Sequence, residues 1–224
     1  NTTARGLPPV QGAPGLIPHM AAGKPRAVVF DIGRVLIEWD LRHLFAPLID
    51  DPAQLDWFLA NVVTEDWHTQ HDAGVTLDDM VPARQAEYPD HAALLDAYRH
   101  RFLDTIPGDV PGSFALLQRL HARGVPLFAL TNFGTEFFAQ YRATQPLLDL
   151  FRDIVVSGDE RCIKPDPAIY AIAERRFGLP AEALLFTDDK RENIATAAAR
   201  GWHTHLFTGA EGLEQRLVAE GLLD

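Results

Sequence analysis

The sequence predicts an α/β fold in which helices cover both faces of a parallel sheet. The first observation is that short apolar runs rich in β-branched residues alternate with segments of helical periodicity in the C-terminal half of the chain. Strands that alternate with helices of this length form βαβ units, whose helices cover the sheet. The second observation is that three apolar runs end in polar side chains, Asp31, Thr131 and Asp188. Ligands bind at the carboxyl ends of strands in such sheets, so this edge is the expected site.

Five apolar runs are expected to be strands, and they cover residues 26–31, 125–132, 154–157, 184–188 and 203–207. Helices are expected between the later strands. Apolar residues at helical spacing from 114 to 120 and from 169 to 177 predict two of them, which end at Gly124 and Gly178. A third helix is expected over residues 191–200. Together these elements predict a Rossmann-like core.

The first two strands lie about 100 residues apart, from Asp31 to Thr131, whereas a parallel crossover needs only about a dozen residues or more, usually as a helix. A second unit is therefore expected between them. Residues 41–106 carry apolar and aromatic side chains at helical spacing and few strand-like runs, so we interpret them as a helical bundle, here called the cap. Residues 24–40 and 107–224 are then expected to form the core.

Composition points to a small-molecule partner. The chain has 224 residues, 47% of them apolar, and a formal net charge of −11, which argues against binding to nucleic acid or to an anionic membrane surface. No apolar run approaches the roughly 20 residues that cross a bilayer, and Cys162 is the single cysteine. We expect a soluble cytoplasmic protein, monomeric or homodimeric. Residues 1–23 are rich in Pro and Gly and are expected to be a disordered leader or the remnant of an expression tag.

Asp31 is the candidate nucleophile. It follows the strand Ala27-Val28-Val29-Phe30 directly, and Gly33 comes two residues later. A carboxylate held at the end of a strand can attack phosphorus or an sp³ carbon and form a covalent intermediate, while glycine lets the backbone approach a ligand closely.

Two further segments offer groups that bind phosphate. Thr131 and Asn132 end the second strand with a hydroxyl and an amide, which can hold a phosphoryl oxygen. Lys164 precedes Pro165, and a lysine there could place a point charge against phosphate and help to keep Asp31 ionised.

Adjacent carboxylates end the fourth strand. Asp188 and Asp189 would repel each other unless a cation offset their charge. Mg²⁺ is the expected cation, because it takes one or two protein carboxylates together with water and substrate oxygens. Asn193 is expected to orient these ligands.

In their order and type, the four segments around Asp31, Thr131, Lys164 and Asp188-Asp189 resemble the four motifs of the haloacid dehalogenase superfamily of phosphatases and dehalogenases. The resemblance covers residues from about 25 to 224 and places a helical cap after the first strand. It implies an Asp31 nucleophile with Lys164 beside it. Thr131, Asn132 and Arg34 are then expected to contact the substrate. The implied metal ligands are Asp31, the Gly33 carbonyl, Asp189 directly, and Asp188 directly or through water.

One position departs from the pattern of most phosphatases in that superfamily, which have a second Asp where this chain has Gly33. The leaving oxygen then lacks its usual acid, and the loss of a general acid typically lowers a rate by about 10²–10⁴. We therefore predict a Mg²⁺-dependent phosphatase acting on a small phosphorylated metabolite, such as a sugar phosphate, with a rate that depends steeply on the leaving group. His68 and His71 are expected to face the cleft from the cap.

Two alternatives stay open at this point. A 2-haloacid dehalogenase would use the same Asp31 nucleophile on carbon and needs neither a metal nor an acid. A non-catalytic phosphometabolite-binding protein would have lost turnover through Gly33.

Overall fold

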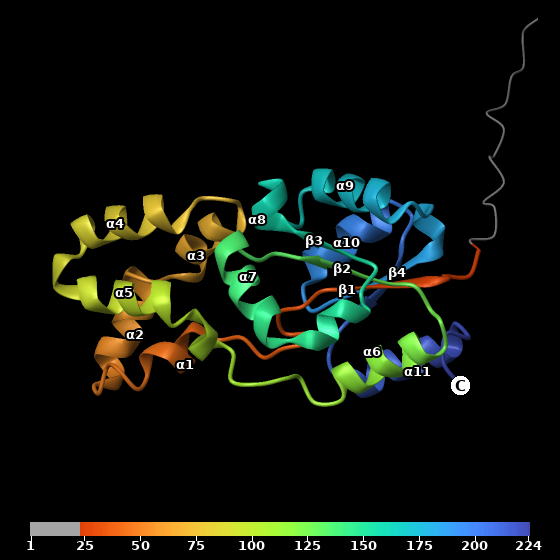
Figure 1. The fold of residues 1–224 in the computed structure, drawn as a ribbon, viewed down its shortest axis with the longest axis horizontal. Helices are drawn as coiled ribbons and strands as arrows, with labels where there is room; N and C mark the ends of the chain where they lie inside the picture. Colours follow the sequence, from red (N-terminus) through yellow and green to blue (C-terminus); the bar gives the residue numbers. More distant parts are fainter. Residues whose placement is uncertain (1–22) are drawn as a thin grey trace, which may run out of the picture.

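A single parallel sheet forms the centre of the computed structural model, which describes residues 23–224. Its five strands lie in the order β3-β2-β1-β4-β5 (Figure 1). Their bounds are Ala27–Phe30 (β1), Leu127–Thr131 (β2), Asp153–Val156 (β3), Leu184–Asp188 (β4) and His203–Leu206 (β5). All five predicted strands are confirmed, with ends that differ by one or two residues. The predicted leader lies almost entirely outside the described residues.

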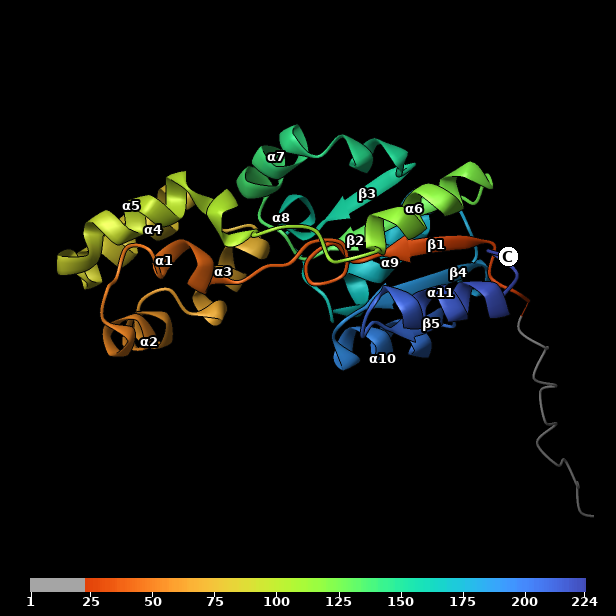
Figure 2. The same ribbon diagram turned by 90° about the horizontal axis from the view of Figure 1, so that it is seen from below.

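Helices cover both faces of the sheet (Figures 1 and 2). Val28, Phe30 and Ala129 pack with α6, α7 and α11 on one face, whereas Val29 and Phe128 pack with α9 and α10 on the other. The bounds are Ser113–Ala122 (α6), Thr135–Thr144 (α7), Pro167–Phe177 (α9), Arg191–Ala199 (α10) and Ala210–Ala219 (α11). The predicted α/β class with a two-sided parallel sheet is confirmed.

The sequence explains why β1, β2 and β4 lie in the middle. Every residue of these three strands is buried, and a strand buried on both faces has to be a continuous apolar run. The edge strand β5 is only half-buried and carries His203 and His205. Shorter elements connect the others: α8 (Ser157–Glu160), and the 3₁₀ turns η3 (Pro146–Leu150) and η4 (Ala181–Ala183).

The chain between β1 and β2 is helical beyond residue 40. It forms α1 (Leu41–Phe45), α2 (Pro52–Asn61), α3 (Glu65–Asp72), α4 (Leu77–Glu87) and α5 (Ala92–His100), with 3₁₀ turns η1 (Pro89–His91) and η2 (Phe102–Thr105). These helices lie together beyond one end of the sheet (Figure 1). Side chains of Asp51, Thr64 and Thr76 cap the starts of α2, α3 and α4. The division into domains at residues 41 and 106 stays a prediction. In residues 23–224 no helix is both long and apolar enough to span a membrane.

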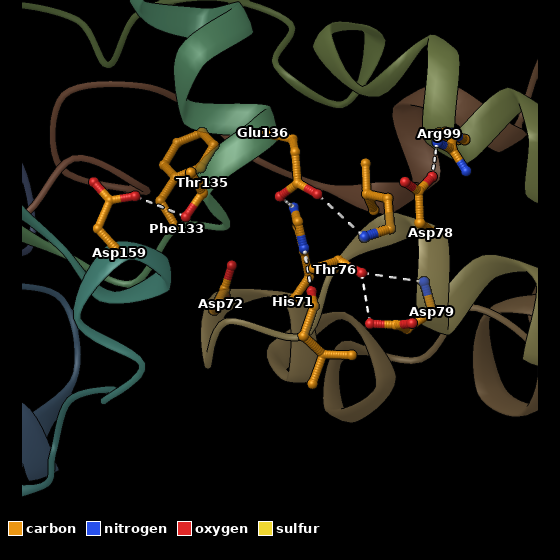
Figure 3. Close-up of polar contacts among 12 residues, drawn as sticks. His71, Asp72, Thr76, Asp78, Asp79, Arg99, Phe133, Thr135, Glu136 and Asp159 are labelled. Atoms are coloured by element: carbon orange, nitrogen blue, oxygen red, sulfur yellow. Dashed lines mark hydrogen bonds and ion pairs between the residues drawn. The ribbon is translucent and has the colours of Figure 1, made fainter.

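His71 joins the cap to the core. Its Nδ1 lies 2.8 Å from the carbonyl of Val75, and its Nε2 lies 3.5 Å from Glu136 on α7 (Figure 3). The ring lies so close to Gly134 that a Cβ at that position would be 1.9 Å from His71 Cδ2. Gly134 has φ −69°, an ordinary backbone conformation, so glycine is needed here for space. The contact fixes the end of α3 against the core.

Candidate active site

The topology of the sheet brings the sequence-predicted residues to one edge. Strand β1 lies between β2 and β4, with Phe30 opposite Ala129 on one side and Thr187 on the other. The backbone N–H of Asp31 donates to the Thr187 carbonyl at 2.9 Å. Asp31 therefore follows directly where β1 ends, level with Leu130 on one neighbouring strand and with Asp188 on the other, and Thr131 comes one residue later.

Lys164 is the positive charge of this site. Its Nζ lies 3.0 Å from Asp31 Oδ1 and donates to Asp188 Oδ2 at 2.6 Å. All three side chains are buried. Burial alone would lower the pKa of Lys164, but the two carboxylates outweigh it and raise the pKa above its ordinary value. Lys164 is thus held as a fixed cation between the candidate nucleophile and Asp188.

Asn132 fixes the backbone of Lys164. Its Nδ2 donates to the Lys164 carbonyl at 3.0 Å, and its Oδ1 accepts from the Lys164 N–H at 2.8 Å. A primary amide has two N–H groups, so one of them is left over for a ligand. The amide that the sequence assigned to substrate therefore also positions the lysine.

Asp188 is the centre of a hydrogen-bond network. Its Oδ1 accepts from the backbone N–H of Lys190 at 2.8 Å, and Asn193 Nδ2 lies 3.0 Å from both of its oxygens. Asn193 thus orients this carboxylate, as the sequence predicted for the ligand set. Asp189 is half-buried and makes no such set of contacts within residues 23–224.

Crowding of carboxylates makes the site receptive to a cation. Asp31, Asp188 and Asp189 each have a carboxylate oxygen that lies within 4.8 Å of an oxygen of the other two. Burial, followed by the charges of Asp188 and Asp189, raises the pKa of Asp31 to about 7 against the opposing charge of Lys164. Burial and Asp188 also raise the pKa of Asp189. Three hard oxygen donors that destabilise one another fit Mg²⁺.

A cavity of about 220 Å³ opens above these groups. Of the predicted site residues, Asp31, Gly33, Arg34, Asn132, Lys164 and Asp189 line it. Thr131 and Asp188 do not line it and are fully buried beside it. Thr131 Oγ1 has no hydrogen-bond partner among the described residues. An unpaired buried hydroxyl is unusual, and it leaves Thr131 free to bond to a ligand atom.

Arg34 reaches from the core toward the cap. It has φ 58°, a rare conformation for a residue other than glycine. Its Nη2 donates to Glu65 at the start of α3 at 2.8 Å, and its guanidinium lies 5.1 Å from the centre of the Trp39 ring. These contacts hold a second positive side chain at the rim of the cavity.

The two cap histidines do not line the cavity, contrary to the expectation from the sequence. His68 and His71 are buried where α3 packs against α7, because their imidazoles take part in an aromatic cluster. Burial lowers the pKa of His68 to about 3, so it is uncharged at neutral pH. Asp72, one residue further along α3, lines the cavity instead. Sequence reasoning missed Asp72, since α3 reaches the sheet edge only through tertiary packing.

A model of haloacid dehalogenase-like hydrolases matches residues 25–201 of the chain. The protein belongs to this family. It is therefore a hydrolase built on the Rossmann-like core that the sequence predicted, and the resemblance of its four motifs is confirmed at the level of the superfamily.

Relatives within this family carry out two kinds of chemistry. The chain is 26% identical over 176 residues to the sesquiterpene phosphatase astK of Aspergillus oryzae, an alignment that covers 79% of this chain and 86% of the relative. It is 28% identical over 131 residues to the (S)-2-haloacid dehalogenase of Pseudomonas putida, an alignment that covers 58% of this chain and 50% of the relative. A family enzyme of Bacteroides thetaiotaomicron, solved with magnesium and inorganic phosphate, shares the fold with a TM-score of 0.63 at 16% identity, over 83% of this chain and 95% of the other.

Proposed function

We propose that this protein is a Mg²⁺-dependent phosphatase that hydrolyses a small phosphorylated metabolite through an aspartyl-phosphate intermediate on Asp31. The observation that carries the proposal is the position of Lys164, 3.0 Å from Asp31 and 2.6 Å from Asp188, at a cavity that Asp189 also lines. A nucleophile, a fixed cation and a group of acidic oxygens meet at one point. This combination suits the transfer of a phosphoryl group, where positioning and charge do most of the catalysis.

The chain's own residues divide the reaction into two steps. A carboxylate oxygen of Asp31 attacks phosphorus, and the bond from phosphorus to the leaving oxygen breaks. Lys164 balances the negative charge of the transferring group, while the unpaired Thr131 hydroxyl, the spare N–H of Asn132 and Arg34 bind its oxygens. Water then attacks phosphorus and gives up one proton to a basic group at the site, the bond from phosphorus to the Asp31 oxygen breaks, and inorganic phosphate and the Asp31 carboxylate are released.

We propose that Asp31, the Gly33 carbonyl and Asp189 hold Mg²⁺, with Asp188 bound directly or through water. The ion would supply positive charge that offsets the phosphoryl oxygens and the carboxylates. The crowding of the three carboxylates supports this assignment, as does the magnesium and phosphate bound to the family enzyme of Bacteroides thetaiotaomicron.

Sugar phosphates are the first substrate class to test, because sugar 1-phosphates have better leaving groups than alkyl phosphates and so suit a site with Gly33. A cavity of about 220 Å³ leaves room beyond a phosphoryl group, and Arg34 and the cap residue Asp72 line it, so the rest of the substrate would lie against these side chains. A free metabolite as partner and a cytoplasmic location stay predictions.

The test is a screen of the full-length protein against phosphorylated metabolites and 2-haloacids, with and without Mg²⁺. Release of phosphate that requires Mg²⁺ is the expected result. Release of halide without metal would replace the proposal with the dehalogenase. Binding of a phosphorylated metabolite, measured by calorimetry, without turnover of any compound would replace it with a non-catalytic binding protein.

A further inference from the structure

Asp72 is an acidic residue of the cap that lines the cavity above Asp31 and Gly33. It is the last residue of α3, and only 7% of its surface is exposed. Its Oδ1 has no hydrogen-bond partner within residues 23–224. Buried carboxylates are normally paired or hydrogen-bonded, so this arrangement calls for an explanation.

The backbone of Asp72 is held firmly. Ser157 Oγ donates to the Asp72 carbonyl at 2.6 Å, which ties the end of α3 to the start of α8. The neighbouring His71 packs against Gly134, as described above, and Figure 3 shows both cap residues beside α7. Asp72 is therefore placed at the cavity by the contact of cap and core.

His68 lies next to the Asp72 carboxyl. Its Nε2 is 3.6 Å from Asp72 Oδ1, and its Nδ1 is 2.8 Å from the Tyr98 hydroxyl. Burial raises the pKa of Tyr98, so its hydroxyl keeps a proton that it can donate to Nδ1. When Tyr98 donates in this way, the neutral imidazole carries its proton on Nε2, the atom 3.6 Å from Asp72 Oδ1. His68 is in a position to orient the Asp72 carboxyl.

We propose that Asp72 is the general acid that protonates the leaving group of the substrate, in place of a carboxyl at position 33. The proposal rests on the phosphatase function proposed above. It explains why a buried carboxyl without a hydrogen bond at Oδ1 borders the cavity that contains Gly33, and it assigns a catalytic role to a cap residue.

The surroundings of Asp72 bring its pKa into the neutral range, so about half of the molecules carry this proton near pH 7. Burial raises its pKa to about 7, opposed by the backbone of Gly134 and by the charge of Lys190. This value already includes the charge of Asp31, which raises the pKa, and the charge of Lys164, which lowers it. His68, on the same helix, is uncharged. A general acid works best when its pKa lies near the working pH.

Asp72 gives up one proton and takes one back in each turnover. As Asp31 attacks phosphorus, the bond to the leaving oxygen breaks and its electron pair takes the proton of the Asp72 carboxyl, which gives the alcohol and an Asp72 carboxylate. In the second step this carboxylate accepts a proton from the water that attacks the aspartyl phosphate. Phosphate leaves, and Asp31 and Asp72 return to their starting states.

The experiment measures kcat/KM of wild type, Asp72→Asn and Asp66→Asn on p-nitrophenyl, phenyl and alkyl phosphates. Asp66 is an exposed acid of the same helix and serves as the control. In Asp72→Asn we expect almost no loss with p-nitrophenyl phosphate, whose leaving group needs no proton, and a loss of about 10²–10⁴ with alkyl phosphates. In wild type, the rate on alkyl phosphates should fall as pH rises above about 7, and this fall should disappear in Asp72→Asn.

A second variant separates chemistry from folding. A Cβ at Gly33 would meet no atom within 4 Å, so Gly33→Asp can supply an acid and should restore alkyl phosphate hydrolysis to Asp72→Asn. An equal loss on all three substrates, or an unchanged slope against leaving-group pKa, would overturn the role of Asp72. A wild type that hydrolyses none of them would instead reject the phosphatase function itself.

Discussion

Asn132 and Lys164 hold each other through two hydrogen bonds, one in each direction between the side-chain amide of Asn132 and the backbone of Lys164. The residues are 32 positions apart in the chain. Because the amide fixes the lysine backbone, it also fixes where Nζ lies relative to Asp31. The side chain that we propose to contact substrate thus also supports the backbone of the lysine.

We predict that Asn132→Ala lowers both activity and stability. It leaves the Lys164 N–H and carbonyl without partners, which typically costs about 1–3 kcal/mol for each buried group. The melting temperature and kcat should both fall. Asn61→Ala removes a single exposed bond from an amide to a backbone carbonyl and should change neither. Equal effects of the two substitutions would contradict the role of the Asn132–Lys164 pair.

Asp31→Asn should abolish turnover and leave the fold intact. The two side chains are nearly isosteric, but an amide is not a nucleophile toward phosphorus. Turnover of p-nitrophenyl phosphate and thermal unfolding are the measurements, with Asp66→Asn as the control. If the purified variant keeps more than a few per cent of wild-type hydrolysis, another residue is the nucleophile.

Mg²⁺ should raise the melting temperature, and chelation should remove phosphatase activity. A ligand that binds only the native state at 100 times its Kd adds about 2.7 kcal/mol to the free energy of unfolding. Asp189→Asn removes one of the three clustered carboxylates, so its melting temperature should respond much less to Mg²⁺. Full activity on a phosphate ester after exhaustive treatment with EDTA would refute the metal site.

Gly134→Ala should destabilise the protein through one steric contact. The added Cβ would collide with the ring of His71 at 1.9 Å, and overpacking of this kind typically costs about 1–3 kcal/mol. In a His71→Ala background the same substitution should be almost neutral. Gly108→Ala, where a Cβ meets nothing within 4 Å, is the matched control. Denaturant unfolding of wild type, the two single variants and the double variant gives the coupling free energy between positions 71 and 134. Additive effects of the two substitutions would show that the His71 ring is not the obstacle.

Much of the core could be predicted because its signals are local. The run from Ala27 to Phe30 is apolar at every position, as a strand buried on both faces has to be, and the helix α9 ends at Gly178 with φ 64°, where the sequence placed its end. The strand ends then brought Asp31 and Asp189 to one edge, because parallel strands share their carboxyl ends.

The cap side of the site could not be predicted in this way. Asp72 lines the cavity because of packing between α3, α7 and α8, and helical periodicity says nothing about which helix residue meets a distant sheet edge. His68 and His71 were expected at the cleft, yet inside the cap–core contact the His68 ring stacks on Phe102 and the His71 ring meets Phe137 edge to face. The sequence predicted a steep dependence on the leaving group from Gly33 alone, and the proposed role of Asp72 predicts a shallow one, so the slope distinguishes the two.

The stability of the metal-free protein should depend on pH through Asp72. The pKa of Asp72 is raised from 3.8 to about 7 in the fold, so the folded protein keeps this carboxyl protonated where the unfolded chain has already lost the proton. A raised pKa of this kind contributes stability below the unfolded pKa, and the contribution is lost as pH rises through the folded one.

Asp72→Asn removes this titration, because its amide stays neutral at every pH. The variant should therefore be about as stable as wild type near pH 4 and progressively more stable than wild type as pH rises to about 7. Because a shift of one pKa unit corresponds to about 1.36 kcal/mol, the gain should reach up to about 4 kcal/mol. Asp31 titrates in both proteins, so the difference between their unfolding free energies reports Asp72 together with its interaction with Asp31. Denaturant unfolding from pH 4 to pH 8 measures it. A constant difference would mean that the fold does not raise the pKa of Asp72, whereas a gain in stability joined to a loss of alkyl phosphate hydrolysis would show a residue kept for catalysis at the expense of the fold.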